Sequence, residues 1–213
     1  MRKARIPGSF ALSVLVAVVF LTGCAEKGPI LLNIGYQATP AEKAGTASRI
    51  VVGVSPFRDV RSVPASVVGK RTIPSGMQND FVVRGTVAKI ATASLREALT
   101  YRGIAVKDVA DWDLTAEGIR AEGAALVLGG EIKTFWLESK GTTVDTHLNA
   151  SIQLKVAAGD TGEMKVIRTM EVNIKLDQDV LYSQERLENM VSEALSSVID
   201  QIFRDEVLKK RFQ

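Results

Sequence analysis

Residues suited to nucleophilic catalysis are scarce in this chain. Its 213 residues include one cysteine, Cys24, and one histidine, His147. A Ser-His-Asp or Cys-His site would have to use that histidine. It shares the polar, solvent-exposed face of an expected strand with Asp145 and Asn149. Residues two apart on a strand are separated by roughly 6.5 Å, so we do not expect direct hydrogen bonds between these side chains. We therefore interpret His147 as an ordinary exposed side chain.

Motifs for metal and phosphate binding are missing from the sequence. It contains no His-Glu-x-x-His and no Cys-x-x-Cys, and Gly69-Lys70-Arg71 lacks the remaining residues of a phosphate-binding loop. Any two of the 24 acidic residues could converge in a glycoside hydrolase, although none lies in an obviously apolar pocket. We predict a protein that is not an enzyme, with no metal and no cofactor, and keep an envelope hydrolase as the last alternative.

The first 23 residues have the pattern of a secretory signal. Arg2, Lys3 and Arg5 precede an apolar run from Phe10 to Leu21, which is shorter than the roughly 20 residues of a membrane-spanning helix. The run ends in Leu21-Thr22-Gly23-Cys24, which resembles the lipobox of bacterial lipoproteins. The resemblance implies cleavage between Gly23 and Cys24 and acylation of Cys24. The alternatives are a lone cysteine after an ordinary signal and an uncleaved anchor helix.

Acylation would also account for the odd cysteine, which would otherwise be an unpaired thiol in an oxidising compartment. Each buried methylene contributes about 0.8 kcal/mol, so several acyl chains on one cysteine hold a protein firmly to a membrane. Residue 25 is Ala rather than Asp. By the same resemblance, this implies delivery to the outer membrane, with the folded domain facing the periplasm.

The charge balance changes when the signal is removed. The whole chain has 27 Lys and Arg against 24 Asp and Glu, a formal net charge of +3, and the signal holds three of the cations. The mature chain is therefore balanced at 24 against 24. A general polycation that binds nucleic acid is excluded, and any basic binding site must be local.

The best local candidate follows the first predicted strand of the domain. Residues 58–80 contain two prolines and two glycines without clear periodicity, which predicts a long loop, and long loops in compact domains are usually functional. Arginine and aromatic residues are enriched in interface hot spots. The candidate partner-binding residues are Phe57, Arg58, Asp59, Arg61, Lys70 and Arg71. The alternative is that Phe57 belongs to the core, the charged residues form local ion pairs and the rest is a mobile loop.

Periodicity predicts a two-layer α/β (α+β) sandwich. Two amphipathic helices should cover one face of a mixed sheet that ends in an antiparallel meander. We predict a tether over 24–48 with an edge strand near 30–37, and a single domain over 49–213. The expected strands are 50–54, 104–109, 125–137, 142–156 and 166–176, and the expected helices are 86–102, 113–122 and 184–207.

Three stretches resemble a known group of lipoproteins. They are the strand Ile50–Phe57 with Arg58-Asp59-Val60-Arg61, the helix end Arg102-Gly103, and Ala124-Ala-Leu-Val-Leu-Gly-Gly-Glu-Ile132. The pattern resembles YajG-like lipoproteins and the auxiliary lipoproteins of ABC-type envelope transport systems. This resemblance implies an α/β sandwich hanging from the outer membrane into the periplasm, without known catalysis.

The resulting hypothesis is a non-enzymatic accessory protein of the cell envelope. It would bind an envelope protein or glycan through residues 58–80 or through the wet face of the sheet. The alternative is a carrier or sensor of a lipid or small glycan, for which a closed apolar cavity between sheet and helices is needed.

Overall fold

The structure is a computed structural model that describes residues 28–39, 50–120, 123–142 and 144–212. The predicted signal, its cleavage site and Cys24 lie outside these residues. Within the described ranges, no helix combines the length and the apolarity needed to cross a membrane.

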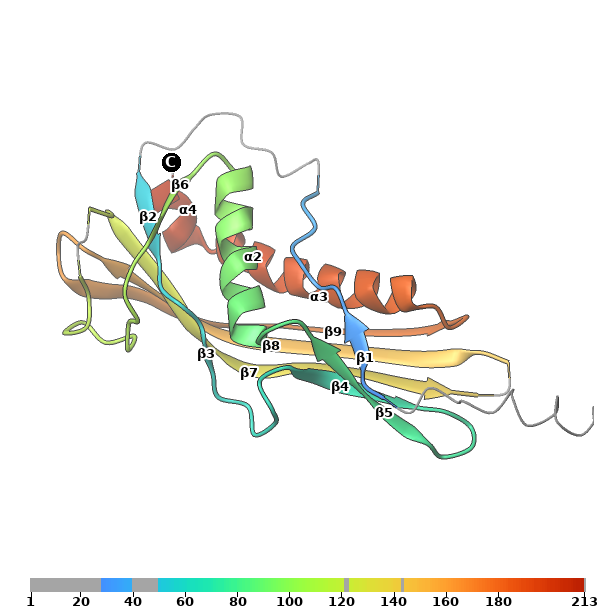
Figure 1. The fold of residues 1–213 in the computed structure, drawn as a ribbon. Coiled ribbons are helices and arrows are strands. Elements are labelled where there is room, and N and C mark those ends of the chain that lie inside the picture. Colours follow the sequence, from blue (N-terminus) through green and yellow to red (C-terminus); the bar gives the residue numbers. More distant parts are fainter. Residues whose placement is uncertain (1–27, 40–49, 121–122, 143, 213) are drawn as a thin grey trace, which may run out of the picture.

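The fold is a two-layer sandwich, as predicted. In the described ranges nine strands form one mixed sheet, and two long helices lie against one of its faces (Figure 1). The strands are β1 (Ile30–Leu32), β2 (Val51–Val54), β3 (Arg58–Asp59), β4 (Val67–Thr72), β5 (Gln78–Val83), β6 (Ala105–Asp108), β7 (Leu126–Gly141), β8 (Thr146–Asp160) and β9 (Lys165–Val180). The helices are α2 (Val87–Tyr101), α3 (Gln184–Arg204) and α4 (Glu206–Phe212).

The long strand β7 organises the sheet. On one edge it pairs antiparallel with β8, which pairs antiparallel with β9, so the predicted meander is confirmed. Its other edge pairs in parallel with β2, β3 and β4 in turn. β6 extends the sheet beyond β2, while β5 and then β1 extend it beyond β4.

The alternation along β7–β9 separates two environments. Phe135, Ile152 and Leu154 point toward α2 and α3 and join one continuous apolar core with the buried stripe of α3. The intervening residues point to the opposite side of the sheet, which we call the open face. The open face is covered at one end by the segment after β6, where Trp112 and Ile119 pack on Val127 and Ala157.

The prediction of a long loop over 58–80 is wrong, because these residues contain β3, β4 and β5. Short strands between proline and glycine turns leave little room for a periodic pattern. β4 is held by a partner almost seventy residues away, with Lys70 in register with Glu138. Gly69 permits this pairing, because a Cβ there would lie 1.9 Å from the carbonyl oxygen of Leu137.

The predicted helix over 113–122 does not form in the described residues 113–120, which contain turns. The Asp113 carboxylate accepts hydrogen bonds from the backbone N–H and the hydroxyl of Thr115, at 3.0 and 2.8 Å. Leu114 has a φ of 66°. This local side-chain turn competes with helix formation and places Trp112 in its buried position.

The C-terminal helix is interrupted at Asp205, which the sequence pattern did not predict. Its backbone is extended, and its carboxylate accepts the N–H groups of Val207 and Leu208 at 3.0 and 3.2 Å, as an N-cap does. The same carboxylate pairs with Arg168 at 2.7 Å. This ion pair explains why a charged residue interrupts the apolar alternation of β9.

After β1, residues 33–37 run along α3 as an extended strap. Two residues of strand advance about 6.6 Å and four residues of helix about 6.0 Å, so alternate backbone N–H groups can meet every fourth helix residue. The N–H groups of Asn33, Gly35 and Gln37 donate to Glu188, Ser192 and Ser196 at 3.1, 3.4 and 2.7 Å. The segment predicted as a tether is therefore docked here.

A buried polar cluster fastens the end of the strap. The Tyr36 hydroxyl donates to Asp200 at 2.8 Å and accepts from Arg102 at 2.7 Å. Arg102 also pairs with Asp200 at 2.8 Å and lies 4.0 Å over the ring of Phe203. Burial raises the pKa of Tyr36 well above its ordinary range. The cluster joins the strap, α2 and α3 through one arginine.

Candidate functional site

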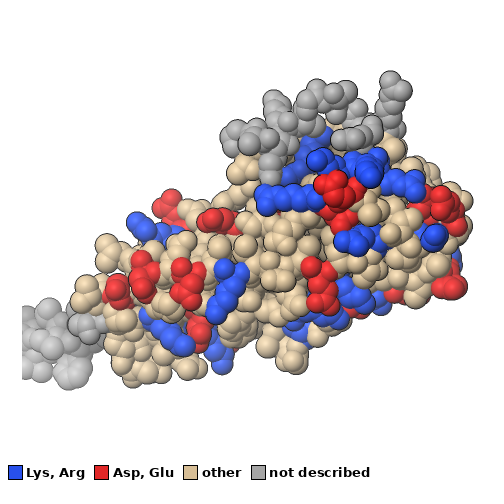
Figure 2. Space-filling view, turned by 180° about the vertical axis from the view of Figure 1, so that it is seen from behind, with Lys and Arg blue, Asp and Glu red and all other residues tan. Residues whose placement is uncertain are grey.

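The open face carries charges of alternating sign. Arg58, Glu131, Lys155 and Glu171 follow one another across β3, β7, β8 and β9. Glu131 contacts Lys133 at 2.7 Å and Arg58 at 3.7 Å, and the hydrogen bond from Lys133 is the main reason that its pKa is lowered. Acidic and basic side chains are also mixed over the side seen from behind in Figure 2. In this pattern, opposite charges on neighbouring strands compensate one another, and the cations do not form a basic patch.

His147 on β8 lies between two carboxylates of β9. Its Nδ1 is 2.8 Å from Asp179 and its Nε2 is 3.1 Å from Asp177. The hydrogen bond to Asp179, with the charge of Asp177, raises the pKa of His147. The sequence spacing did not predict these partners, because it relates only residues on the same strand, and Asp177 and Asp179 lie on the neighbouring strand. With a carboxylate at each ring nitrogen, neither is left to activate a nucleophile.

Metal-ligating side chains do not converge in the described part of the chain. Across residues 28–39, 50–120, 123–142 and 144–212, no group of three or more His, Cys, Asp or Glu is arranged to hold a metal ion.

The structure divides the predicted partner-binding residues among different environments. Phe57 is buried in the core, so near to Gly130 that a Cβ there would lie 2.5 Å from its ring. Lys70 is exposed on β4, and its neighbour Arg71 lies 3.6 Å over the ring of Tyr182. Consecutive strand residues point to opposite faces, so Lys70 and Arg71 do not belong to one basic surface.

Arg61 and Asp59 form a local staple. Two guanidinium nitrogens of Arg61 contact the two carboxylate oxygens of Asp59 at 2.8 and 2.7 Å. A third donates to the carbonyl oxygens of Val67 and Phe135 at 2.9 and 3.0 Å. Burial alone would raise the pKa of Asp59, but the hydrogen bonds from Arg61 outweigh it and lower that pKa. The staple holds the turn after β3 against the edge of β7.

A groove lies beside this staple. β7 pairs with β3 through Ile132 and with β4 from Leu137 onward, and its register against β8 shifts between Ile132 and Thr134. The interval leaves an open groove of about 270 Å³. We call it the Trp136 groove. It is lined by Val60, Arg61, Ser62, Val63, Lys133, Thr134, Phe135 and Trp136.

The Trp136 groove brings together two sequence features that lie far apart in the chain, the Phe135-Trp136 pair and the segment that contains Val60. The residues Phe135 and Trp136 were predicted to face opposite sides, and Phe135 is buried in the core while Trp136 is half-buried. Val60, within the predicted binding segment, is exposed. The groove itself was not predicted, because it depends on the pairing of β3 and β4 with β7.

Comparison with known proteins identifies the fold. No family model and no curated protein matches the chain. Protein XCC0632 from Xanthomonas campestris, of the DUF330 family model, has 11% identity and a TM-score of 0.56 over 85% of this chain and 95% of its own. A putative neuraminyllactose-binding hemagglutinin homolog from Helicobacter pylori has 14% identity and a TM-score of 0.45, over 85% and 98%. Lipoprotein GNA1162 from Neisseria meningitidis has 14% identity and a TM-score of 0.34, over 74% and 99%. The likeness to XCC0632 shows a shared fold.

Proposed function

We propose that this protein is a lipid-anchored accessory component of the bacterial cell envelope. It binds a protein partner at the Trp136 groove and catalyses no reaction itself. The observation that carries the proposal is the groove, where a half-buried tryptophan and the exposed Val60 meet on an otherwise charged face.

The size of the groove supports a protein partner. Small-molecule pockets usually enclose about 300–1,000 Å³, whereas this groove is open and holds about 270 Å³. It suits one or two side chains of a partner, and tryptophan is enriched in interface hot spots. Between the layers, apolar side chains from the sheet and both helices pack into one cluster. This packing favours an accessory role over the lipid or glycan carrier.

The arrangement around His147 supports a role without catalysis. The only histidine of the chain contacts a carboxylate through each ring nitrogen. A general base needs one nitrogen free to take the proton of the attacking group. This geometry suits a cross-strand ion pair that stabilises the open face.

The membrane anchor in the proposal is the acylated Cys24. Its support is the signal pattern followed by Leu-Thr-Gly-Cys, and the Ala at position 25 favours the outer membrane with the domain in the periplasm. The resemblance to YajG-like and ABC-type auxiliary lipoproteins belongs to the same proposal. Cys24→Ala should abolish acylation and leave an unprocessed or soluble protein. Unchanged mass and unchanged membrane fractionation would contradict the anchor.

Crosslinking tests the partner. A photo-reactive amino acid at position 60 should give one discrete crosslinked protein in intact cells, and the additional substitution Trp136→Ala should remove it. The matched control is Ser151→Ala, which alters the open face outside the lining of the groove. A crosslink that survives Trp136→Ala in a protein with an unchanged Tm would overturn the groove as the binding site.

A further inference from the structure

One end of the molecule gathers three turns and the entry of the N-terminal segment. The β4–β5 hairpin touches the β7–β8 hairpin, where a Cβ on Gly141 would lie 3.3 Å from Pro74. The β9–α3 turn joins them, because Val180 is in register with Thr146. The β4–β5 hairpin, the β7–β8 hairpin and the β9–α3 turn lie together in Figure 1, at the end away from β2 and β6.

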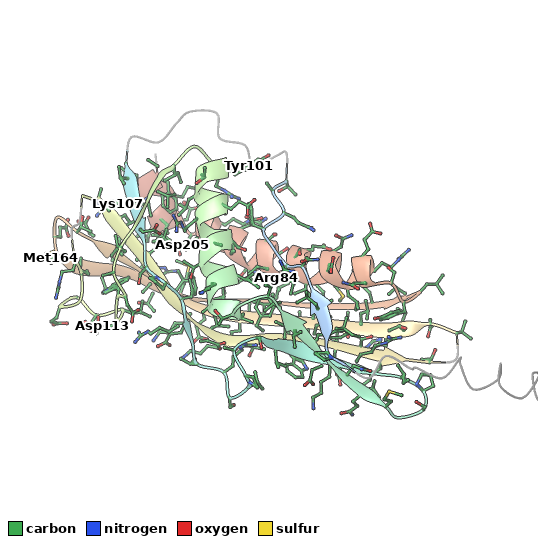
Figure 3. The ribbon with its side chains drawn as sticks, viewed as in Figure 1. Arg84, Tyr101, Lys107, Asp113, Met164 and Asp205 are labelled. Atoms are coloured by element: carbon green, nitrogen blue, oxygen red, sulfur yellow. The ribbon has the colours of Figure 1, made fainter. Side chains whose placement is uncertain are left out.

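This end carries the most exposed large apolar side chains of the described residues. Val144 in the β7–β8 turn is 82% exposed, and Leu181 in the β9–α3 turn is 69% exposed. Pro74 is also exposed. We call Val144, Leu181 and Pro74 the apolar end. At the opposite end, Met164 in the β8–β9 turn is 45% exposed, and it is labelled there in Figure 3.

The N-terminal segment starts at the same end. The side chain of Asn79 on β5 donates to the Gly28 carbonyl at 2.9 Å, and Gln184 at the start of α3 donates to the Leu31 carbonyl at 2.9 Å. Residues 28–37 are held by β5 and by the hydrogen bonds of the strap. Gly28 therefore has a fixed position beside the apolar end.

The length of the chain before Gly28 then limits where the membrane can be. Cys24 is four residues before Gly28, and four residues span at most roughly 14 Å when fully extended. A lipid bilayer that holds Cys24 must therefore lie close to Gly28. The domain cannot move far from the surface on a long linker.

We propose that the apolar end docks on the lipid surface that holds the anchor. Val144, Leu181 and Pro74 enter the interfacial region, and the long axis of β7–β9 points away from the bilayer. The Trp136 groove then lies on the side of the domain, open to a partner. This inference rests on the proposed acylation of Cys24.

The charged side chains that the structure describes near this end are of both signs and form no basic patch, and Lys140 pairs with Glu138 at 3.1 Å. Arg71 is occupied by the ring of Tyr182, and the Asp145 carboxylate accepts a hydrogen bond from Thr142 at 2.5 Å. Asp177 and Asp179 are engaged by His147. Docking should therefore depend little on anionic lipid.

The test uses the intact lipoprotein in phosphatidylcholine vesicles, with and without phosphatidylglycerol. Because Cys24 is the only cysteine, Val144→Cys, Leu181→Cys and, as the distal control, Met164→Cys each provide one thiol for an environment-sensitive fluorophore once Cys24 is acylated. Mass spectrometry of each protein first establishes the acylation. Fluorophores at 144 and 181 should lose most of their emission when a nitroxide lipid is added, and the one at 164 should lose none, in both lipid mixtures.

Each other outcome overturns a distinct claim. Unquenched emission at 144 and 181 in an acylated protein overturns the docking and leaves the anchor intact. Equal quenching at all three positions also overturns the docking, because no end is preferred. A protein without acyl chains that stays unbound to vesicles overturns the anchor itself.

Discussion

The two faces of β7–β9 use alternate residues of the same strands for different purposes. On the helix side, Phe135 and Ile152 are fully buried and join one apolar core. On the open face, their neighbours Trp136 and Ser151 are partly exposed among charged residues. The helix side therefore determines the fold, whereas packing constrains the side chains of the open face less. Substitutions at matched positions on the two faces should therefore differ strongly in their effect on stability.

The largest contrast is expected for the two adjacent aromatic residues. Phe135→Ala should lower the free energy of unfolding by about 3–5 kcal/mol, because it leaves a cavity in a fully packed core. Trp136→Ala should lower it by about 1 kcal/mol, because its side chain lies in an open groove. Urea denaturation followed by circular dichroism measures both. Equal losses would show that Trp136 is a core residue and would weaken its assignment to partner binding.

A similar contrast in stability is expected for two arginines, one largely buried on the helix side and one partly exposed on the open face. Arg102 and Asp200 are only 11% and 8% exposed, whereas Arg58 on the open face is 38% exposed and 3.7 Å from Glu131. Arg102→Met should cost about 3 kcal/mol, because it removes the guanidinium that pairs with the buried Asp200 carboxylate and packs on the ring of Phe203. Arg58→Met should change stability by less than about 1 kcal/mol.

Thermal unfolding at neutral pH should separate these two variants. A small effect of Arg102→Met would mean that water or another group compensates Asp200. The cluster that joins the strap, α2 and α3 would then contribute less than its geometry indicates.

The contrast between the faces also explains what the sequence could predict. The alternation in β8 and the apolar stripe of α3 are local patterns, so the meander, the two long helices and their common face follow from them. β3 has two residues and pairs with β7, and β4 has six residues and pairs with the adjacent β5 and with the distant β7. No local pattern reveals such a partner, so residues 58–80 resembled a loop.

The same limit applies to the candidate site. The Trp136 groove exists because β7 changes partners between Ile132 and Leu137, and this depends on tertiary pairing. Arg61 was proposed for partner binding, but its hydrogen bonds to Val67 and Phe135 make it a support of the groove. Burial of an arginine by backbone carbonyls leaves no signal in a single sequence. The residue type of Arg61 made it a candidate, but the sequence did not indicate the direction in which its side chain points.

A smaller effect is expected where the strap meets α3 on the helix side. Ser196→Ala removes the hydroxyl that accepts the N–H of Gln37 at 2.7 Å. A net hydrogen bond contributes about 1 kcal/mol, so the unfolding free energy should fall by about that amount. The matched control, Ser197→Ala, changes the adjacent helix residue.

Hydrogen exchange reports this contact directly. The amide of Gln37 should exchange faster in Ser196→Ala than in Ser197→Ala or the unsubstituted protein, while amides in β8 remain unchanged. Equal exchange of Gln37 in all three proteins would mean that the strap is held by its other contacts alone.

The smallest effect, and the one that sharpens the open face itself, concerns His147. Its pKa is raised by the hydrogen bond to Asp179 and the charge of Asp177. A raised folded-state pKa means that the protonated pair stabilises the fold fully below the unfolded value of about 6.5, and that this contribution is lost as pH rises through the folded value. His147→Gln should therefore be less stable than the unsubstituted protein at pH 5, about 1.5 units below the ordinary pKa, and equally stable at pH 9, about 2.5 units above it.

The single histidine makes the underlying titration easy to follow. Its ring gives one set of NMR signals, and the pKa read from them should fall in Asp179→Asn but not in Glu171→Gln, whose carboxylate accepts from Gln153 instead. A pKa that Asp179→Asn leaves unchanged would assign the shift to Asp177 alone. An ordinary pKa in the unsubstituted protein would mean that water screens this pair completely, and that the open face near β9 is held by backbone pairing without help from its charges.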